Sequence, residues 1–140
     1  MREIRFRVWV KALKRMSNLI EFYCGGGALA GDYEYPLDKN DIEVMQYTGL
    51  KDKNGVEIYE GDIVIQHCEW VGGYGSDEFG ENESFGVVKI YPSKGAVITR
   101  AKRRDIIECD DKWVKCHDLN LRSYRVRVVG NIHENPELLK

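Results

Sequence analysis

The chain has 140 residues, of which 43% are hydrophobic and 31% charged, and its formal net charge at pH 7 is −2. This composition suits one packed globular domain and excludes a generally disordered chain. No apolar run reaches the length of about 18 residues that a membrane-spanning helix needs. The first residues, MREIRFRVWV, lack the apolar segment and cleavage site of a signal peptide, so we expect a cytoplasmic protein with no membrane partner.

The first predicted elements form a β-hairpin followed by a loop. Apolar and polar side chains alternate in REIRFRVWV, residues 2–10, which is the pattern of a half-buried strand. The segment KALKRMSN, 11–18, predicts a turn, and LIEFYC, 19–24, predicts the returning strand. Turn-forming residues fill the segment 25–41, which we therefore expect to be a loop.

The most patterned stretch is YTGLKDKNGVEIYEGDIV, which overlaps a short predicted strand ending at Gly49. Within it, Asn54-Gly55 predicts a hairpin turn, because this pair accepts positive φ angles. Glu60, Gly61 and Asp62 predict a second, tighter corner, and Gly61 is expected to have positive φ. A strand follows at once in IVIQHCEWV.

The remaining chain continues this rhythm of short strands and turns. GGYGSDEFGENES, 72–84, predicts an acidic loop, and PSKG predicts a turn between the strands FGVVKIY and AVITRA. The segment 102–121 fits either two short strands or one strand and a helical turn. SYRVRVVGNI, 123–132, alternates like a strand. ENPELL predicts a final helical turn, with Asn135 as its cap and Pro136 at its first position.

These elements predict a mainly β protein. We expect a small barrel-like, SH3-like β core with an N-terminal hairpin and a short C-terminal helical turn. Residues 1–140 are expected to form a single domain. An alternative division separates an N-terminal hairpin and loop region, 1–46, from the barrel-like core, 47–140.

Charge is distributed unevenly along the chain. Between Lys53 and Lys89 there are eight acidic residues and no lysine or arginine, whereas both ends of the chain are basic. Such asymmetry indicates either a solvated surface, a contact between copies or a nucleic-acid surface. If the basic strands pair, they would present one basic sheet face to nucleic acid, although the pI of about 5.9 is low for that function. The candidate residues for this face are Arg5, Arg7, Arg103, Arg104, Arg125 and Arg127.

No pattern in the sequence predicts catalysis or a cofactor. The carboxylates of Glu60 and Asp62 are close, but Gly-Asp before a strand is typical of a turn. The four cysteines lack the close pairs of a zinc site, so we expect free thiols and no bound metal. We therefore predict that the protein is not an enzyme and holds no cofactor.

Four segments together resemble the YopX family of phage and prophage proteins. They are MREIRFRVW, YTGLKDKNGVEIYEGDIV, FGVV and VVGNIHENPELL, in this order from Met1 to the C-terminus. The resemblance implies a small, mainly β protein encoded by a mobile element in a bacterial host, which assembles into oligomers and has no established activity. The residues that carry this structural signature are Gly49, Asn54, Gly55, Tyr59, Glu60, Gly61, Asp62, Gly130, Asn131, Asn135 and Pro136.

The expected function follows from both lines of reasoning. We expect a phage or prophage accessory protein that forms a homo-oligomer and binds another protein in the cytoplasm of the bacterial host. The alternative is a nucleic-acid-binding β module that uses the basic sheet face.

Overall fold

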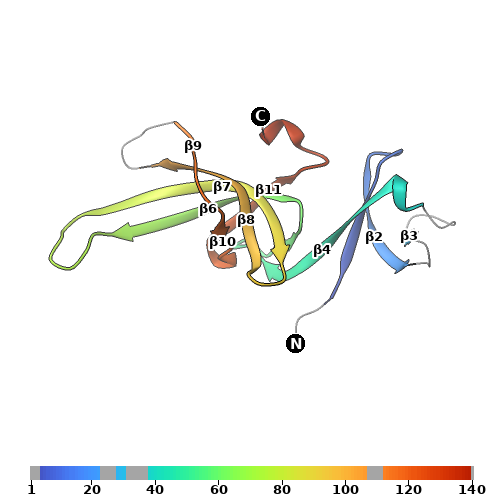
Figure 1. Ribbon diagram of the computed structural model, residues 1–140, viewed down its shortest axis with the longest axis horizontal. Helices are drawn as coiled ribbons and strands as arrows, with labels where there is room; N and C mark the ends of the chain where they lie inside the picture. Colours follow the sequence, from blue (N-terminus) through green and yellow to red (C-terminus); the bar gives the residue numbers. More distant parts are fainter. Residues whose placement is uncertain (1–3, 23–27, 31–37, 107–111, 140) are drawn as a thin grey trace.

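The structure, a computed structural model, describes residues 4–22, 28–30, 38–106 and 112–139. It is mainly β, as predicted, and contains two antiparallel sheets beside short 3-10 turns (Figure 1). The N-terminal sheet lies at one end of an elongated molecule, and a long two-stranded arm projects from the other end. None of the helical turns in these ranges is long and apolar enough to cross a membrane.

The N-terminal sheet contains the predicted hairpin, in the strand order β3-β2-β1-β4-β5. Its turn is shorter than expected, because Lys14 adopts a φ of 51° and β2 begins directly after it. The predicted loop is also interrupted by a short strand, β3, that pairs with β2, while residues 25–27 and 31–37 lie outside the described residues. The elements are β1 (Phe6–Val10), β2 (Arg15–Phe22), β3 (Ala28–Ala30), η1 (Lys39–Asp41), β4 (Ile42–Lys51) and β5 (Glu57–Tyr59).

Strand β4 does not end at Gly49, contrary to the prediction. Gly49 has a φ of 84°, and the pairing of β4 with β5 shifts register between Tyr47 and Lys51. The strand thus bends at a bulge and continues, which is a common use of glycine inside a strand. Beyond the bend, Leu50 packs against the core of the second sheet. The boundary after residue 46 therefore falls inside β4.

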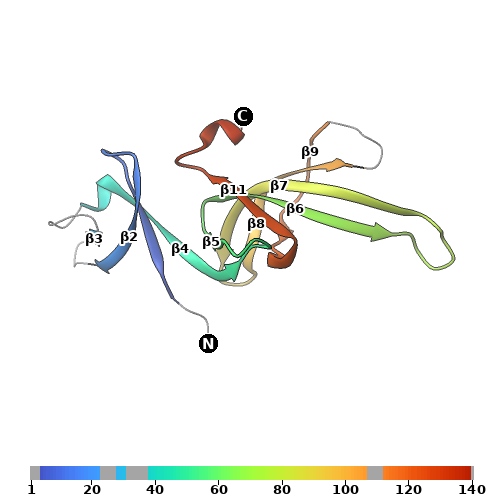
Figure 2. The same ribbon diagram turned by 180° about the vertical axis from the view of Figure 1, so that it is seen from behind.

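The second sheet is a curled half-barrel rather than a closed barrel, with the strand order β10-β8-β7-β6-β11. Its core also takes Ile58 from β5, which lies against this sheet when the molecule is seen from behind (Figure 2). The fully buried members of the core are Ile58, Val64, Val88, Ile98 and Val126. The strands are β6 (Asp62–Val71), β7 (Phe79–Tyr91), β8 (Gly95–Asp105), β9 (Val114–Lys115), β10 (Leu119–Asn120) and β11 (Val126–Asn131), with β9 paired to β8.

Two predicted loops are replaced partly or wholly by strands. Strand β7 begins at Phe79, so the second half of the expected acidic loop is paired with β6. In the ambiguous segment 102–121, β8 continues to Asp105 and two short strands follow. Within the described residues, the segment therefore forms strands and not a helical turn. Cross-strand pairing stabilises these polar sequences as strands even though their alternation is weak.

The C-terminal segment follows its prediction except where its strand begins. The strand begins only at Val126, because the 3-10 turn η2 (Ser123–Arg125) precedes it. Pro136 is the first residue of η3 (Pro136–Leu139), as expected. The side-chain oxygen of Asn135 accepts a hydrogen bond of 3.3 Å from the backbone N–H of Asn131, so this side chain ties the final turn back to β11.

Substitution of Gly61 by valine is expected to lower the free energy of unfolding by about 1–3 kcal/mol. Gly61 has a φ of 84°, and an added Cβ would lie 3.2 Å from Met45 Sδ. Gly55→Ala is the control: Gly55 has the same φ, but an added Cβ meets no atom within 4 Å. It should cost about 1 kcal/mol through backbone strain alone. Urea denaturation measures the free energy of unfolding of both variants. An unchanged value for Gly61→Val would refute the assignment of Gly61 to a tight corner that requires positive φ.

Candidate functional site

The corner between β5 and β6 is where the two sheets meet. The N–H of Gly61 donates a 2.9 Å hydrogen bond to the carbonyl of Val88, and the carbonyl of Gly61 accepts one of 2.9 Å from Ile132. The N–H of Glu60 donates to the carbonyl of Gln46 in β4. The positive φ of Gly61 turns its peptide groups toward both neighbours, so this corner joins β4, β7 and the C-terminal segment.

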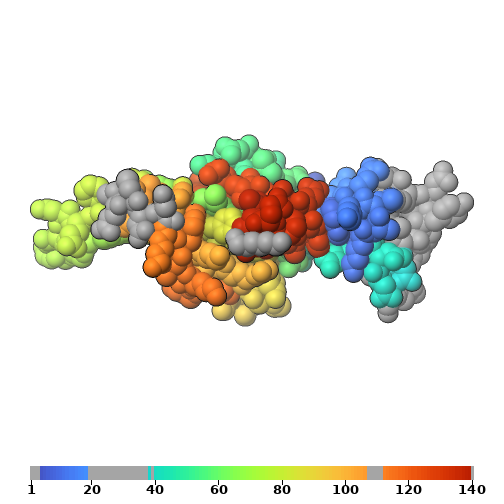
Figure 3. Space-filling model, turned by 90° about the horizontal axis from the view of Figure 1, so that it is seen from above, coloured from blue at the N-terminus to red at the C-terminus, as the bar shows by residue number. Residues whose placement is uncertain are grey.

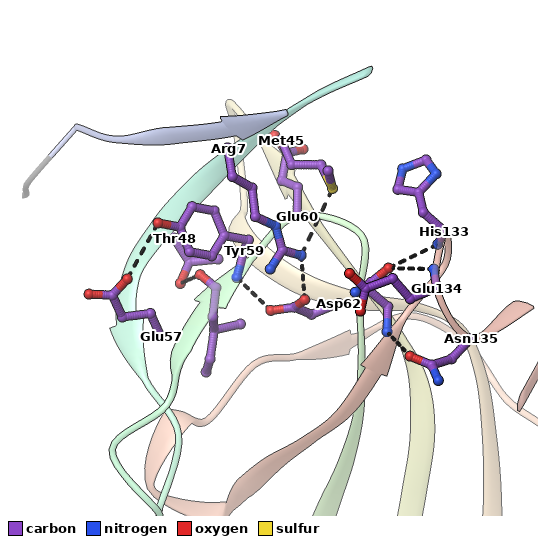
Figure 4. A network of polar contacts seen from close by, with 12 residues as sticks. Arg7, Met45, Thr48, Glu57, Tyr59, Glu60, Asp62, His133, Glu134 and Asn135 are labelled. Carbon is purple, nitrogen blue, oxygen red and sulfur yellow. Dashed lines mark hydrogen bonds and ion pairs between the residues drawn. The ribbon is translucent and has the colours of Figure 1, made fainter. Parts of the chain in front are cut away.

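A buried ion pair lies directly behind this corner. The Arg7 guanidinium contacts one carboxylate oxygen of Asp62 at 2.5 Å, and the side chains are only 15% and 2% exposed (Figure 4). The other oxygen of Asp62 accepts a 2.8 Å hydrogen bond from the N–H of Tyr59, whose ring lies under Arg7 at 4.5 Å. Burial raises the pKa of Asp62, and the charge of Arg7 opposes that rise. The pair connects β1 of one sheet with β6 of the other.

Arg5, just before β1 and two residues from Arg7, repeats the same arrangement. Its guanidinium forms an ion pair with Glu57 and lies 4.6 Å above the ring of Tyr47. The rings of Tyr47 and Tyr59 are 5.3 Å apart on paired strands, so two arginines stack on two neighbouring tyrosines. Side-chain hydrogen bonding to Arg5 is the main cause that lowers the pKa of Glu57.

The arginines proposed for a nucleic-acid face are divided between the two sheets. Strand β1 pairs with β2 and β4, whereas β11 pairs with β6 in the other sheet, so the two strands that we expected to pair are not neighbours. Arg104 bonds to Glu83 at 2.9 Å and lies over Trp113. Arg125 ends η2 instead of lying on β11, while Arg103 and Arg127 are exposed.

Sequence reasoning missed Asp52, which organises the turn between β4 and β5. One carboxylate oxygen accepts hydrogen bonds from the N–H groups of Asn54 and Val56, at 2.8 and 2.9 Å. The other accepts from Val128 in β11 at 3.0 Å. Burial acts to raise the pKa of Asp52, but these three donors overcome it and lower the pKa. An aspartate two residues before Asn-Gly was the available signal, because such side chains cap their own turn.

The C-terminal signature residues form a second local cluster. The side-chain oxygen of Asn131 accepts hydrogen bonds from the N–H groups of His133 and Glu134, at 3.0 and 2.8 Å. A Cβ at Gly130 would lie 2.6 Å from the side-chain oxygen of Asn135, so only glycine fits beneath that side chain.

His133 connects this cluster to the N-terminal sheet. Its ring stacks on Trp9 with centroids 5.3 Å apart, and its Nε2 lies 3.0 Å from a carboxylate oxygen of Glu43. Burial lowers the pKa of His133, while Glu43 opposes the shift. The signature residues at the corner and the C-terminus thus hold the two sheets together, and none of these contacts requires a ligand.

The arm formed by the outer halves of β6 and β7 has a different character. Strand β6 pairs with β11 only as far as Gln66, and β7 pairs with β8 only as far as Asn82. The arm is therefore a two-stranded ribbon over its outer part, where Glu69–Val71 pair with Phe79–Glu81. Val71 is 81% exposed, Phe79 is 68% exposed, and Tyr74 is fully exposed at the tip. The arm carries acidic residues and no lysine or arginine. Large exposed hydrophobic side chains therefore gather on the outer part of an otherwise polar, acidic ribbon.

Residues with metal-binding side chains also occur on the arm. His67, Glu69 and Glu81 bring one ligand atom each to within 4.8 Å of one another. His67 Nε2 lies 3.7 Å from a carboxylate oxygen of each glutamate. When the imidazole is protonated, it forms an ion pair with Glu69 on its own strand and with Glu81 across the ribbon. Cys68 and Cys116 are free thiols, and the other two cysteines lie outside the described residues.

Replacement of Asp52 by alanine should lower the free energy of unfolding by about 2–4 kcal/mol, because three backbone N–H groups lose a charged acceptor. The matched control is Asp77→Ala, which removes an exposed carboxylate from the arm and should change stability by at most about 0.5 kcal/mol. Chemical denaturation at neutral pH measures both. Equal effects of the two substitutions would contradict the role of Asp52.

Acid stability should depend on the same carboxylate. The pKa of Asp52 in the folded chain lies below the ordinary value of 3.8, so the unfolded chain binds a proton first as the pH falls. Its stabilising contribution is therefore present above that value and is lost as the pH falls through the folded pKa. Between about pH 6 and about pH 3, the Asp52→Asn variant should lose less stability than the native chain. Equal losses of stability in the variant and the native chain would contradict a contribution of the Asp52 carboxylate to acid stability.

Comparison with known proteins places the chain in a family. The solved structure of protein EF1440 from Enterococcus faecalis is similar over 100% of both chains, at 22% sequence identity and a TM-score of 0.49. A search of the curated proteins finds no match. The family described as YopX protein matches residues 5–140, which is nearly the whole chain. The matched range includes the segments at the corner and the C-terminus that hold the sheets together. The chain therefore belongs to the YopX family.

Proposed function

We propose that the protein is a non-enzymatic accessory protein of phages or prophages, which acts by binding other protein chains through the β6–β7 arm. Family membership supports the phage or prophage origin and, with it, action in the cytoplasm of a bacterial host. The observation that carries the binding function is the cluster of exposed apolar side chains at the tip of an isolated two-stranded projection.

Two physical arguments support the arm as a contact element. A two-stranded ribbon is only marginally stable in water without a third strand or a packing partner. Large aromatic side chains supply most of the binding energy at protein interfaces, and contiguous exposed apolar groups mark such interfaces. Contact with another chain would cover Val71, Tyr74 and Phe79 and would also stabilise the ribbon.

The first partner that we propose is a second copy of the chain. The arm is acidic, whereas the exposed Lys11 and Lys14 of the β1–β2 turn and the exposed Arg127 of β11 are basic, so surfaces of opposite sign are available on every copy. Complementary charge favours and orients such an encounter. A protein of the host is a further partner that could use the same tip.

A double substitution of the tip tests this function. The change Tyr74→Ser with Phe79→Ser should leave the chain folded, as judged by circular dichroism, and reduce the molar mass in light scattering at micromolar concentration toward the 16.2 kDa of one chain. The control is Val114→Ser with Tyr124→Ser, which alters side chains that are 57% and 66% exposed elsewhere.

The outcomes separate the parts of the proposal. A monomeric native chain across a dilution series would contradict self-association. A native oligomer that survives the tip substitutions, or that is lost equally in the control, would show that the arm is not its contact.

A further inference from the structure

A cavity of about 480 Å³ lies on a face of the half-barrel that the arm and the corner do not use. It is bounded by β7, β8 and β9 and by the C-terminal turn η3, which contributes Leu139. Figure 3 shows the segment around β9 (orange) beside the C-terminal segment (red) on one face of the molecule. The N–H of Cys116 donates a 2.9 Å hydrogen bond to the carbonyl of Ala101, which fixes this wall against β8.

The walls of the cavity carry an excess of positive charge. Arg100, Lys102 and Lys115 line it together with a single carboxylate, Asp118, so the local charge is two positive units. Within the described residues, the structure gives none of these four side chains an ion pair or hydrogen bond. Burial raises the pKa of Cys116, so its thiol is neutral near pH 7 and adds no negative charge. The positive charge is therefore available to an anion.

The backbone of Arg100 is a second, independent sign of a binding role. Arg100 has a φ of 54° inside β8, opposite a register shift between Phe85 and Val87 in β7. A non-glycine residue in this left-handed region is strained, and such residues and bulges gather at functional sites. The two strands approach closely at this bulge, because a Cβ at Gly86 would lie 2.7 Å from the carbonyl oxygen of Thr99. Glycine would suit the backbone at position 100 better, yet an arginine that lines the cavity occupies it.

We propose that this cavity binds an organic phosphate monoester of the nucleotide class. A monoester carries about two negative charges at neutral pH, which balances the cavity, and arginine with lysine is the usual protein partner of phosphate. Phe85, Ala101 and Leu139 form the apolar part of the wall, and Phe85 offers an aromatic ring for a base. The ligand is a free nucleotide or the terminal phosphate of a nucleic-acid strand.

Titration calorimetry of the full chain at low salt tests the ligand class with AMP and adenosine. AMP should saturate a single site, and adenosine should bind at least about tenfold more weakly, because it lacks the charged group. Oligo(dT) with and without a 5′-phosphate distinguishes the sources. Preference for the phosphorylated strand over AMP assigns the site to strand ends, and the reverse assigns it to free nucleotides. Failure of AMP to bind, or equal binding of adenosine, would overturn the proposal.

The two residues with the same strained backbone provide a matched pair of variants. Arg100→Gly removes one charge from the cavity and relieves the positive φ, so it should fold at least as stably as the native chain but bind AMP about tenfold or more weakly. Lys14→Gly removes one charge and relieves a φ of 51° in the β1–β2 turn, away from the cavity, and should bind AMP normally. Lys115→Gln provides a second change in the cavity with the same expected loss. Equal AMP affinity of the Arg100 and Lys14 variants would refute the site.

Discussion

The ion pair between Arg7 and Asp62 is the contact on which the arrangement of the two sheets depends. Asp62 is almost fully buried, and removing a carboxylate from water is costly unless a cation and hydrogen-bond donors face it. Arg7 from β1 and the N–H of Tyr59 meet that requirement from the other sheet. The corner can place Asp62 there only because Gly61 adopts positive φ.

The two binding surfaces that we propose lie away from this junction. The side chains of the signature segments satisfy one another at the corner, around Asp52 and in the C-terminal cluster. The junction thereby holds the half-barrel in a fixed position relative to the N-terminal hairpin. The acidic arm with its exposed tip projects from the half-barrel, and the basic cavity lies beside β8 and β9. The first suits a protein contact and the second suits a small anion.

The sequence predicted elements where local chemistry decides the structure. The positive φ of Gly55 and Gly61 and the helical start at Pro136 follow from single residues. Sequence-based prediction failed where pairing with distant residues determines the structure. Strand β4 continues through a bulge at Gly49, and pairing with β6 makes a polar, acidic stretch part of strand β7. Tertiary contacts also give Arg5 and Arg7 a role that the sequence did not predict, as partners in ion pairs between distant segments. Alternation on β1 suggested a basic face, but nothing local in the sequence shows that β5 and β6 bring acids to Arg5 and Arg7.

A double-mutant cycle on Arg7→Met and Asp62→Asn tests the central claim most directly. Each free energy of unfolding is measured by urea denaturation at neutral pH, with the transition followed separately in each sheet by amide hydrogen exchange. The buried pair predicts a coupling energy of at least about 2 kcal/mol and a common transition for both sheets in the native chain. Additive effects within about 0.5 kcal/mol, with separate unfolding of the two sheets, would contradict the claim that this ion pair holds them together.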